Sequence, residues 1–218
     1  MQLPFPLVEE PDDVSCEKGR KLFVGSNADF LKGVVAMSGL PGDDRVEVCF
    51  AGRSNVGKSS LINALLNRKK LAKASAEPGR TRQLNYFDVA EGQLYLVDLP
   101  GYGYARASKS EIAQWTKLTM NYLQGRPTLK RIFMLIDARH GVKSTDEEVM
   151  DILDSAAVVY QIVLTKLDKL KKSDQLGISE QVVAKLKKRP AFHPVVIETS
   201  SVDGIGLPEL KAEIASLI

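Results

Sequence analysis

The sequence lacks the features that mark membrane and secreted proteins. No stretch approaches the roughly 20 consecutive apolar residues that a membrane-spanning helix needs. No basic residue precedes Lys18 and no continuous apolar run follows Met1, so we expect no secretory signal. The two cysteines, Cys16 and Cys49, have neither metal-ligand spacing nor a companion histidine cluster. We therefore expect a cytoplasmic protein with reduced thiols and no membrane partner.

A strong charge of either sign is also missing. Lys and Arg number 30 against 27 Asp and Glu, and the net charge is +3. A surplus this small does not predict nucleic-acid binding by itself. Hydrophobic residues make up 44% of the chain and charged residues 26%, which is close to the average for globular proteins and excludes a disordered or fibrous class.

The apolar pattern divides the 218 residues near position 44. Residues 1–44 contain many prolines and glycines with short apolar pieces, which predicts an extension packing on the domain. In residues 45–218, short apolar runs alternate with amphipathic segments, as in βαβ units. We predict one α/β domain with a mostly parallel six-stranded sheet and helices on both faces. The expected strands span residues 46–51, 84–89, 94–98, 132–137, 161–165 and 195–199, and the expected helices span 58–66, 111–123, 147–155, 179–188 and 208–217.

A phosphate-binding loop is predicted between the first of these strands and the first helix. Residues 52–59 read Gly-Arg-Ser-Asn-Val-Gly-Lys-Ser, which matches the P-loop pattern in full. Backbone N–H groups and the helix N-terminus would surround phosphate oxygens, Lys58 would bridge the β- and γ-phosphates, and the Ser59 hydroxyl would bind Mg²⁺. The alternative is a glycine-rich turn with a solvated lysine. The candidate contacts are Gly52, Arg53, Ser54, Asn55, Val56, Gly57, Lys58 and Ser59.

Two later loops are candidates for reading the base. Thr165, Lys166, Leu167 and Asp168 follow a predicted strand. A carboxylate at Asp168 can accept hydrogen bonds from both N1–H and the 2-amino group of guanine, a donor pair that adenine lacks, and the Lys166 stem would lie along the base. The alternative is a helix cap with solvated charges. After the last strand, Thr199, Ser200 and Ser201 can offer backbone N–H groups to the base oxygen.

Switch segments are predicted at two further places. Asp98, Leu99, Pro100 and Gly101 end a strand, so that Asp98 would orient Mg²⁺ through its water shell and the Gly101 N–H would sense the γ-phosphate. Thr81 lies between the first helix and the second strand, and it is the candidate for a second Mg²⁺-binding hydroxyl. The alternative at Thr81 is a polar surface turn.

The order of these motifs resembles the EngB (YihA/YsxC) family of bacterial ribosome-assembly GTPases, in the translation-factor-related class. The resemblance is carried by residues 52–59, Pro-Gly-Arg-Thr at 78–81, Asp-Leu-Pro-Gly-Tyr-Gly-Tyr-Ala at 98–105, and residues 165–168 and 199–201. It implies a Ras-like G domain that acts in assembly of the large ribosomal subunit and is needed for normal cell division and septation. The expected partners are GTP or GDP and the subunit precursor with its RNA, and we expect a monomer.

The resemblance also implies a set of site residues. Lys58, Thr81 and Gly101 are the catalytic candidates, and Ser59 and Thr81 are the expected Mg²⁺ ligands. Nucleotide contacts are implied at residues 52–59, 98–101, 165–168 and 199–201 and, in the first switch, at Gly79, Arg80, Thr81, Arg82 and Gln83.

Two departures from Ras-type GTPases affect the expected activity. Thr165 stands where the base motif has asparagine, and Tyr102 stands where the water-orienting glutamine would follow Gly101. Tyrosine lacks the paired donor and acceptor of an amide, so we expect slow intrinsic hydrolysis. We hypothesise that Asn55 helps to hold a K⁺ ion beside the phosphates, and the alternative is that it hydrogen-bonds within the loop.

Basic clusters occur at residues 68–70 with Lys73, at 169–172 and at 185–189. On one face they could meet RNA phosphates, and the alternative is that they are solvated helix ends. Two other functions remain open from the residues: an ATP-dependent small-molecule kinase, which shares the P-loop and the fold, and an assembly scaffold that binds guanine nucleotide without useful hydrolysis.

Overall fold

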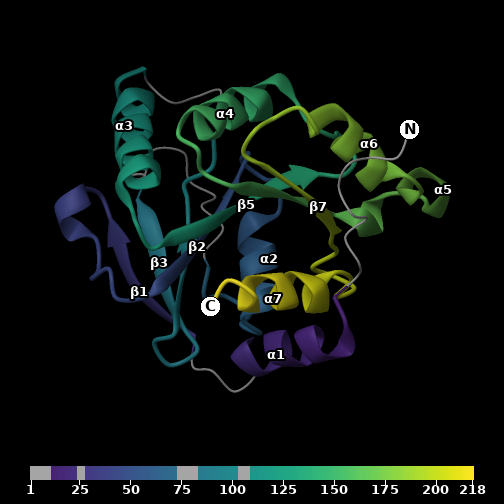
Figure 1. Cartoon of the computed structure of the whole chain (residues 1–218), viewed down its shortest axis with the longest axis horizontal. Helices are drawn as coiled ribbons and strands as arrows, with labels where there is room; N and C mark the ends of the chain where they lie inside the picture. Colours follow the sequence, from purple (N-terminus) through teal and green to yellow (C-terminus); the bar gives the residue numbers. More distant parts are fainter. Residues whose placement is uncertain (1–10, 24–27, 73–82, 103–108) are drawn as a thin grey trace.

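The computed structural model describes residues 11–23, 28–72, 83–102 and 109–218, with the backbone alone for 109–116. It contains a seven-stranded sheet in the order β1-β3-β4-β2-β5-β6-β7, with helices on both faces (Figure 1). The strands are β1 (Asp29–Val34), β2 (Val46–Gly52), β3 (Leu84–Val89), β4 (Leu94–Asp98), β5 (Leu129–Asp137), β6 (Tyr160–Thr165) and β7 (Phe192–Glu198). The α-helices are α1 (Asp13–Phe23), α2 (Lys58–Leu65), α3 (Lys109–Gly125), α4 (Ser144–Ser155), α5 (Lys172–Gln175), α6 (Ile178–Leu186) and α7 (Leu207–Ala215).

The predicted α/β class with a mostly parallel sheet is confirmed, but the sheet has seven strands and not six. The additional strand, β1, pairs antiparallel with the edge of β3. Its sequence, Asp-Phe-Leu-Lys-Gly-Val, does not alternate apolar and polar residues, so it did not indicate a strand. The expected boundary between an extension and the domain near residue 44 stays a prediction.

Alternating side chains of the strands supply two hydrophobic cores, one on each face of the sheet. In β2, Cys49 contributes to the core that includes Tyr122 of α3, on the face covered by α3, α4 and α6 (Figure 1). Phe50 contributes to the opposite core, with Leu61 of α2 and Leu210 of α7. Burial of each large apolar side chain stabilises the fold by about 1.5–3 kcal/mol. The near-continuous apolar character of the central strands follows from this burial on both faces.

Helix α1 packs against α7 on the outer side of the α2 face (Figure 1). The approach is close at Gly19, where an added Cβ would lie 2.5 Å from the Ala212 nitrogen and 2.6 Å from the Lys211 carbonyl carbon. At the end of the helix, Phe23 is 3% exposed and joins the same core as α2 and α7. The part of the chain that precedes β2 thus contributes a packed helix, α1, and an edge strand, β1.

The topology brings the ends of several strands to one edge of the sheet. Strand β2 pairs in parallel with β4 on one side and with β5 on the other. The strands that follow β2 in the chain are therefore added first on one side of it and then on the other, so the strand order reverses at β2. Ligands of such sheets bind beyond the carboxyl ends of the strands at this reversal point. In the part of the chain that the structure describes, no helix is long and apolar enough to cross a membrane.

Candidate functional site

The loop between β2 and α2 has the backbone geometry of a tight cradle. Asn55 and Gly57 both adopt left-handed conformations, with φ of 63° and 106°. An added Cβ on Gly52 would lie 2.8 Å from Val56 Cγ1, so this close approach requires glycine. Helix α2 begins at Lys58, as predicted, and its first-turn N–H groups have no partners within the helix. The loop therefore presents backbone donors that can bind an anion.

Lys58 and Asp98 form an ion pair next to this loop. Asp98 ends β4, whose register places it opposite Phe50 in β2. The Lys58 Nζ contacts Asp98 Oδ1, and the two side chains are only 12% and 7% exposed. The Ser59 hydroxyl and the Asp98 carboxylate are hard oxygen donors, which Mg²⁺ prefers together with phosphate oxygens. Within the described ranges, no group of three or more His, Cys, Asp or Glu residues could hold a metal ion.

The segment after Asp98 lies directly against the phosphate loop. The Ser54 N–H donates to the Tyr102 carbonyl at 3.1 Å, and the Tyr102 N–H donates to the Gly52 carbonyl at 3.3 Å. An added Cβ on Gly101 would lie 3.3 Å from the Ser54 nitrogen. Backbone hydrogen bonds therefore join the segment after Asp98 to the phosphate loop.

Tyr102 is directed into the protein. Its side chain is buried, and its hydroxyl donates to Asp146 Oδ1 at 2.8 Å. Burial, reinforced by the charge of Asp146, raises the pKa of Tyr102 well above its usual value, so the hydroxyl remains a donor. Asp146 also accepts from the Lys143 N–H at the start of α4, and Arg53 Nε lies 3.3 Å from its Oδ1. Asp146 was not predicted as a site residue. The helix expected from the sequence began at residue 147, directly after Asp146, whereas α4 begins at Ser144.

The base motif is tied to the phosphate loop by side-chain hydrogen bonds. At the end of β6, Thr165 Oγ1 donates to the Val56 carbonyl at 2.7 Å. Lys166 is left-handed with φ of 62°, and its Nζ donates to the Asn55 carbonyl at 2.5 Å. Threonine in place of asparagine thus still connects the two loops.

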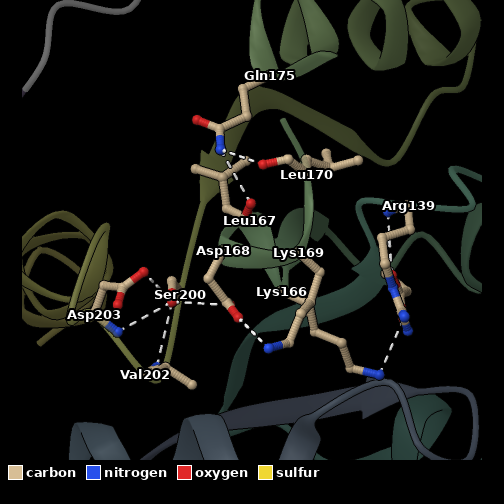
Figure 2. A network of polar contacts seen from close by, with 11 residues as sticks. Arg139, Lys166, Leu167, Asp168, Lys169, Leu170, Gln175, Ser200, Val202 and Asp203 are labelled. Carbon is tan, nitrogen blue, oxygen red and sulfur yellow. Dashed lines mark hydrogen bonds and ion pairs between the residues drawn. The ribbon is translucent and has the colours of Figure 1, made fainter. Parts of the chain in front are cut away.

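Asp168 contacts the loop that follows β7 (Figure 2). Ser200 Oγ donates to Asp168 Oδ1 at 3.0 Å, and Lys169 Nζ lies 3.2 Å from Oδ2. Burial opposes ionisation, but the hydrogen bonds from Lys169 and Ser200 outweigh it and lower the pKa of Asp168. The Leu167 N–H donates to the Thr199 carbonyl at 3.1 Å, which joins the backbones of the two loops. The carboxylate is therefore an ionised acceptor at neutral pH.

Comparison with known proteins places these motifs in a family. The model of the 50S ribosome-binding GTPase family matches residues 47–166. The probable GTP-binding protein EngB of Hyphomonas neptunium is 64% identical over 203 residues, covering 92% of each chain. Its counterpart in Roseobacter denitrificans is 58% identical over 217 residues, covering both chains fully. The chain belongs to the EngB family. It is thus a GTP-binding protein and a GTPase, which excludes the kinase alternative and confirms the resemblance.

Solved structures agree with an EngB-type fold. A crystal structure of a probable GTP-binding protein EngB matches with a TM-score of 0.62 and 22% identity, over 79% of this chain and 98% of that one. Era from Aquifex aeolicus, bound to GDP and AlF₄⁻, matches with a TM-score of 0.61 and 24% identity, over 80% of this chain and 57% of that one. Identities this low show the fold alone.

Some of the site and motif residues that the sequence predicts lie outside the described residues. This holds for Gly79, Arg80, Thr81 and Arg82 of the first switch and for residues 103–105 of the second. Gln83 is described: its Nε2 donates to Asn85 Oδ1 at 3.0 Å, and it packs over Gly33 of β1. Within the described ranges, no hydrogen bond joins Gln83 to the phosphate loop.

A second charged residue, besides Asp146, was not predicted from the sequence. Asp137 ends β5, and its carboxylate lies between Lys166 and Arg139. Its place in the sequence could have indicated it, because Asp137 is the last residue of an apolar strand, as Asp98 is of β4.

Proposed function

We propose that this EngB-family protein is a Mg²⁺-dependent guanine-nucleotide switch with slow intrinsic GTP hydrolysis. The observation that carries the proposal is the ionised Asp168 carboxylate, held by Ser200 on a loop that Thr165 bonds to the phosphate loop. A carboxylate placed there can accept both hydrogen bonds of the guanine N1–H and 2-amino group. Of the three N–H groups expected to serve the guanine oxygen, those of Thr199 and Ser200 already donate to backbone carbonyls, at 2.7 Å and 3.0 Å. The Ser201 N–H would therefore be the one offered to the base.

The phosphates would lie on residues 52–59. Lys58 would exchange its Asp98 partner for β- and γ-phosphate oxygens, which releases the carboxylate to face the metal's water shell. Ser59 and Thr81 would bind Mg²⁺, which supplies positive charge that offsets the charge of the phosphate oxygens. Gly101 would donate its N–H to the γ-phosphate. The further expected contacts are Leu99, Pro100, Leu167, Gly79, Arg80, Arg82 and Gln83.

Intrinsic hydrolysis is slow in this proposal because no amide orients the attacking water. Tyr102 occupies the glutamine position, and its hydroxyl is already bound by Asp146. A K⁺ ion near Asn55 would supply positive charge beside the phosphates, and a partner could stimulate hydrolysis further.

The proposed partner is a precursor of the large ribosomal subunit and its RNA, in the cytoplasm, with the protein acting as a monomer. The family description, 50S ribosome-binding GTPase, supports this choice. Exposed lysines at positions 169, 171 and 172, beside the base loop, would meet RNA phosphates. Loss of ribosome assembly would impair cell division and septation. A scaffold without useful hydrolysis is the competing function, and single-turnover hydrolysis with and without subunits separates the two.

The first experiment measures nucleotide affinity for the wild type and Asp168→Asn with GDP, XDP and ADP in Mg²⁺ buffer. We expect the wild type to prefer GDP over ADP by at least about 100-fold, because mismatched partners leave buried polar groups unpaired. Asp168→Asn should shift the preference toward XDP, whose 2-oxygen accepts from the new amide.

Asp203→Asn is the matched control, because Asp203 lies 3.4 Å from the same Ser200 hydroxyl without belonging to the base motif. It should keep the GDP preference. Equal wild-type affinity for ADP and GDP would contradict the base-reading role of Asp168.

A further inference from the structure

Asp137 is a buried carboxylate that belongs to none of the nucleotide motifs. It ends β5, which lies between the phosphate-loop strand β2 and the base-loop strand β6. Its side chain is 6% exposed and accepts two hydrogen bonds from the Arg139 side chain, Nε to Oδ1 at 2.9 Å and Nη2 to Oδ2 at 2.7 Å. The Arg139 backbone N–H donates a third, to Oδ1 at 3.1 Å. The Lys166 Nζ lies 3.0 Å from the same Oδ2, on the Arg139 side of the site (Figure 2). Two cations therefore converge on one carboxylate.

The contacts of Lys166 show what this carboxylate holds in place. Besides its ion pair with Asp137, the Lys166 Nζ donates to the Asn55 carbonyl at 2.5 Å. An added Cβ on Gly57 would lie 3.6 Å from Lys166 Cε, so the lysine stem passes over the phosphate loop. A long flexible side chain loses conformational entropy when it is fixed, and partners at its tip must offset that loss.

The charge of Asp137 is secured by its surroundings. Burial opposes ionisation, but the hydrogen bonds from Arg139 and Lys166 outweigh it and hold the pKa of Asp137 well below its usual range. The carboxylate is consequently ionised at neutral pH. Its conversion to an amide would leave Lys166 and Arg139 beside each other without a counter-charge, and the lysine could move away from the phosphate loop.

We propose that Asp137 is a positioning residue of the guanine-nucleotide site, which fixes the Lys166 side chain across the phosphate loop in the pose that receives the base. The inference rests on the proposed function, because it assigns Lys166 to the base. Asp137 acts through Lys166 and touches no nucleotide atom. Asp137 therefore affects the affinity for nucleotides with and without the 2-amino group alike, whereas Asp168 distinguishes between them.

The test compares GDP with inosine diphosphate, which lacks the 2-amino group, in a double-mutant cycle. Asp137→Asn should weaken both nucleotides by the same factor, about tenfold or more, because a charged hydrogen-bond partner of Lys166 is lost. In a Lys166→Met background, Asp137→Asn should change the affinity by less than about twofold, since the side chain it positions is gone. Asp168→Asn should instead change the ratio of the two affinities.

Arg139→Gln is the matched control, because it removes the other partner of Asp137 and leaves Lys166 in place. It should leave GDP affinity close to the wild-type value. If Asp137→Asn folds poorly, the Asp137→Asn/Arg139→Gln variant removes the excess positive charge and should still bind GDP weakly.

Three results would overturn the inference: an unchanged affinity in Asp137→Asn, a loss of equal size with and without Lys166, or an equal loss in Arg139→Gln. Each leaves the proposed function intact as long as the wild type prefers GDP and Asp168→Asn shifts toward XDP. Failure of that preference would instead remove the proposed function itself.

Discussion

Each lysine of the two nucleotide motifs pairs with a carboxylate at the end of a different strand. Lys58 of the phosphate loop contacts Asp98 at the end of β4, and Lys166 of the base motif contacts Asp137 at the end of β5. These two carboxylates hold both amines beside the phosphate loop.

The potassium hypothesis is also a statement about a single residue. Asn55 is exposed and left-handed, and its carbonyl accepts from Lys166, whereas its side chain makes no hydrogen bond within the described part of the chain. We expect GTP hydrolysis to be about tenfold or more faster in K⁺ than in Na⁺, because added positive charge stabilises the transition state. Single-turnover rates in matched salts measure this effect.

Asn55→Ala should remove the dependence on K⁺. Asn67→Ala is the control, since Asn67 has the same left-handed backbone, with φ of 50°, at the far end of α2. Equal rates in K⁺ and Na⁺ for the wild type would rule out the hypothesis.

At the scale of elements, the contact between α1 and α7 depends on one glycine. An added Cβ on Gly19 would lie 2.8 Å or less from three backbone atoms of α7, which cannot move as a flexible side chain would. Gly19→Ala should therefore destabilise the protein by about 1–3 kcal/mol through overpacking, although alanine favours helix by up to about 1 kcal/mol. Denaturant unfolding monitored by circular dichroism measures the change.

Gly125→Ala is the control for helix propensity, because Gly125 ends α3 and an added Cβ there meets no atom within 4 Å. Its effect on stability should be small. Equal stability of the Gly19→Ala and Gly125→Ala variants would mean that α1 does not pack on α7 at this distance in solution.

At the scale of the whole molecule, one edge of the sheet carries the nucleotide loops together with exposed lysines. Lys171 and Lys172 lie at the start of α5, after the base loop, whereas Lys130 lies at the opposite end of the sheet near the start of β5. We expect the GTP-loaded protein to co-sediment with large ribosomal subunit precursors, with an affinity that falls steeply as salt rises. Reversal of both charges, in Lys171→Glu/Lys172→Glu, should weaken this binding and leave GDP affinity unchanged.

Lys130→Glu changes the net charge in the same direction from the far end of the sheet and should bind nearly as the wild type does. Binding that is insensitive to salt, or equally weak in both variants, would contradict an RNA contact beside the base loop.

The sequence by itself determined the local part of this protein. A phosphate loop binds through backbone N–H groups of consecutive residues, so residues 52–59 could be identified from their order alone. Each of the six strands expected from apolar runs is present. Among them β2, β4 and β6 are buried on both faces and therefore read as near-continuous apolar segments. The family also followed from motif order, and comparison with relatives confirmed it.

Only the tertiary structure decided which distant residues meet. Thr165 and Val56 are bonded across 109 positions, and Lys166 and Asn55 across 111, which no sequence spacing announces. The exposed strand β1 shows no apolar alternation, and it exists because the edge of β3 supplies its hydrogen-bond partners. The contacts of Asp137 with Lys166 and of Asp146 with Tyr102 likewise form only because the folded sheet brings these residues together. Motif chemistry is local, whereas the contacts that position it come from the packing of the whole sheet.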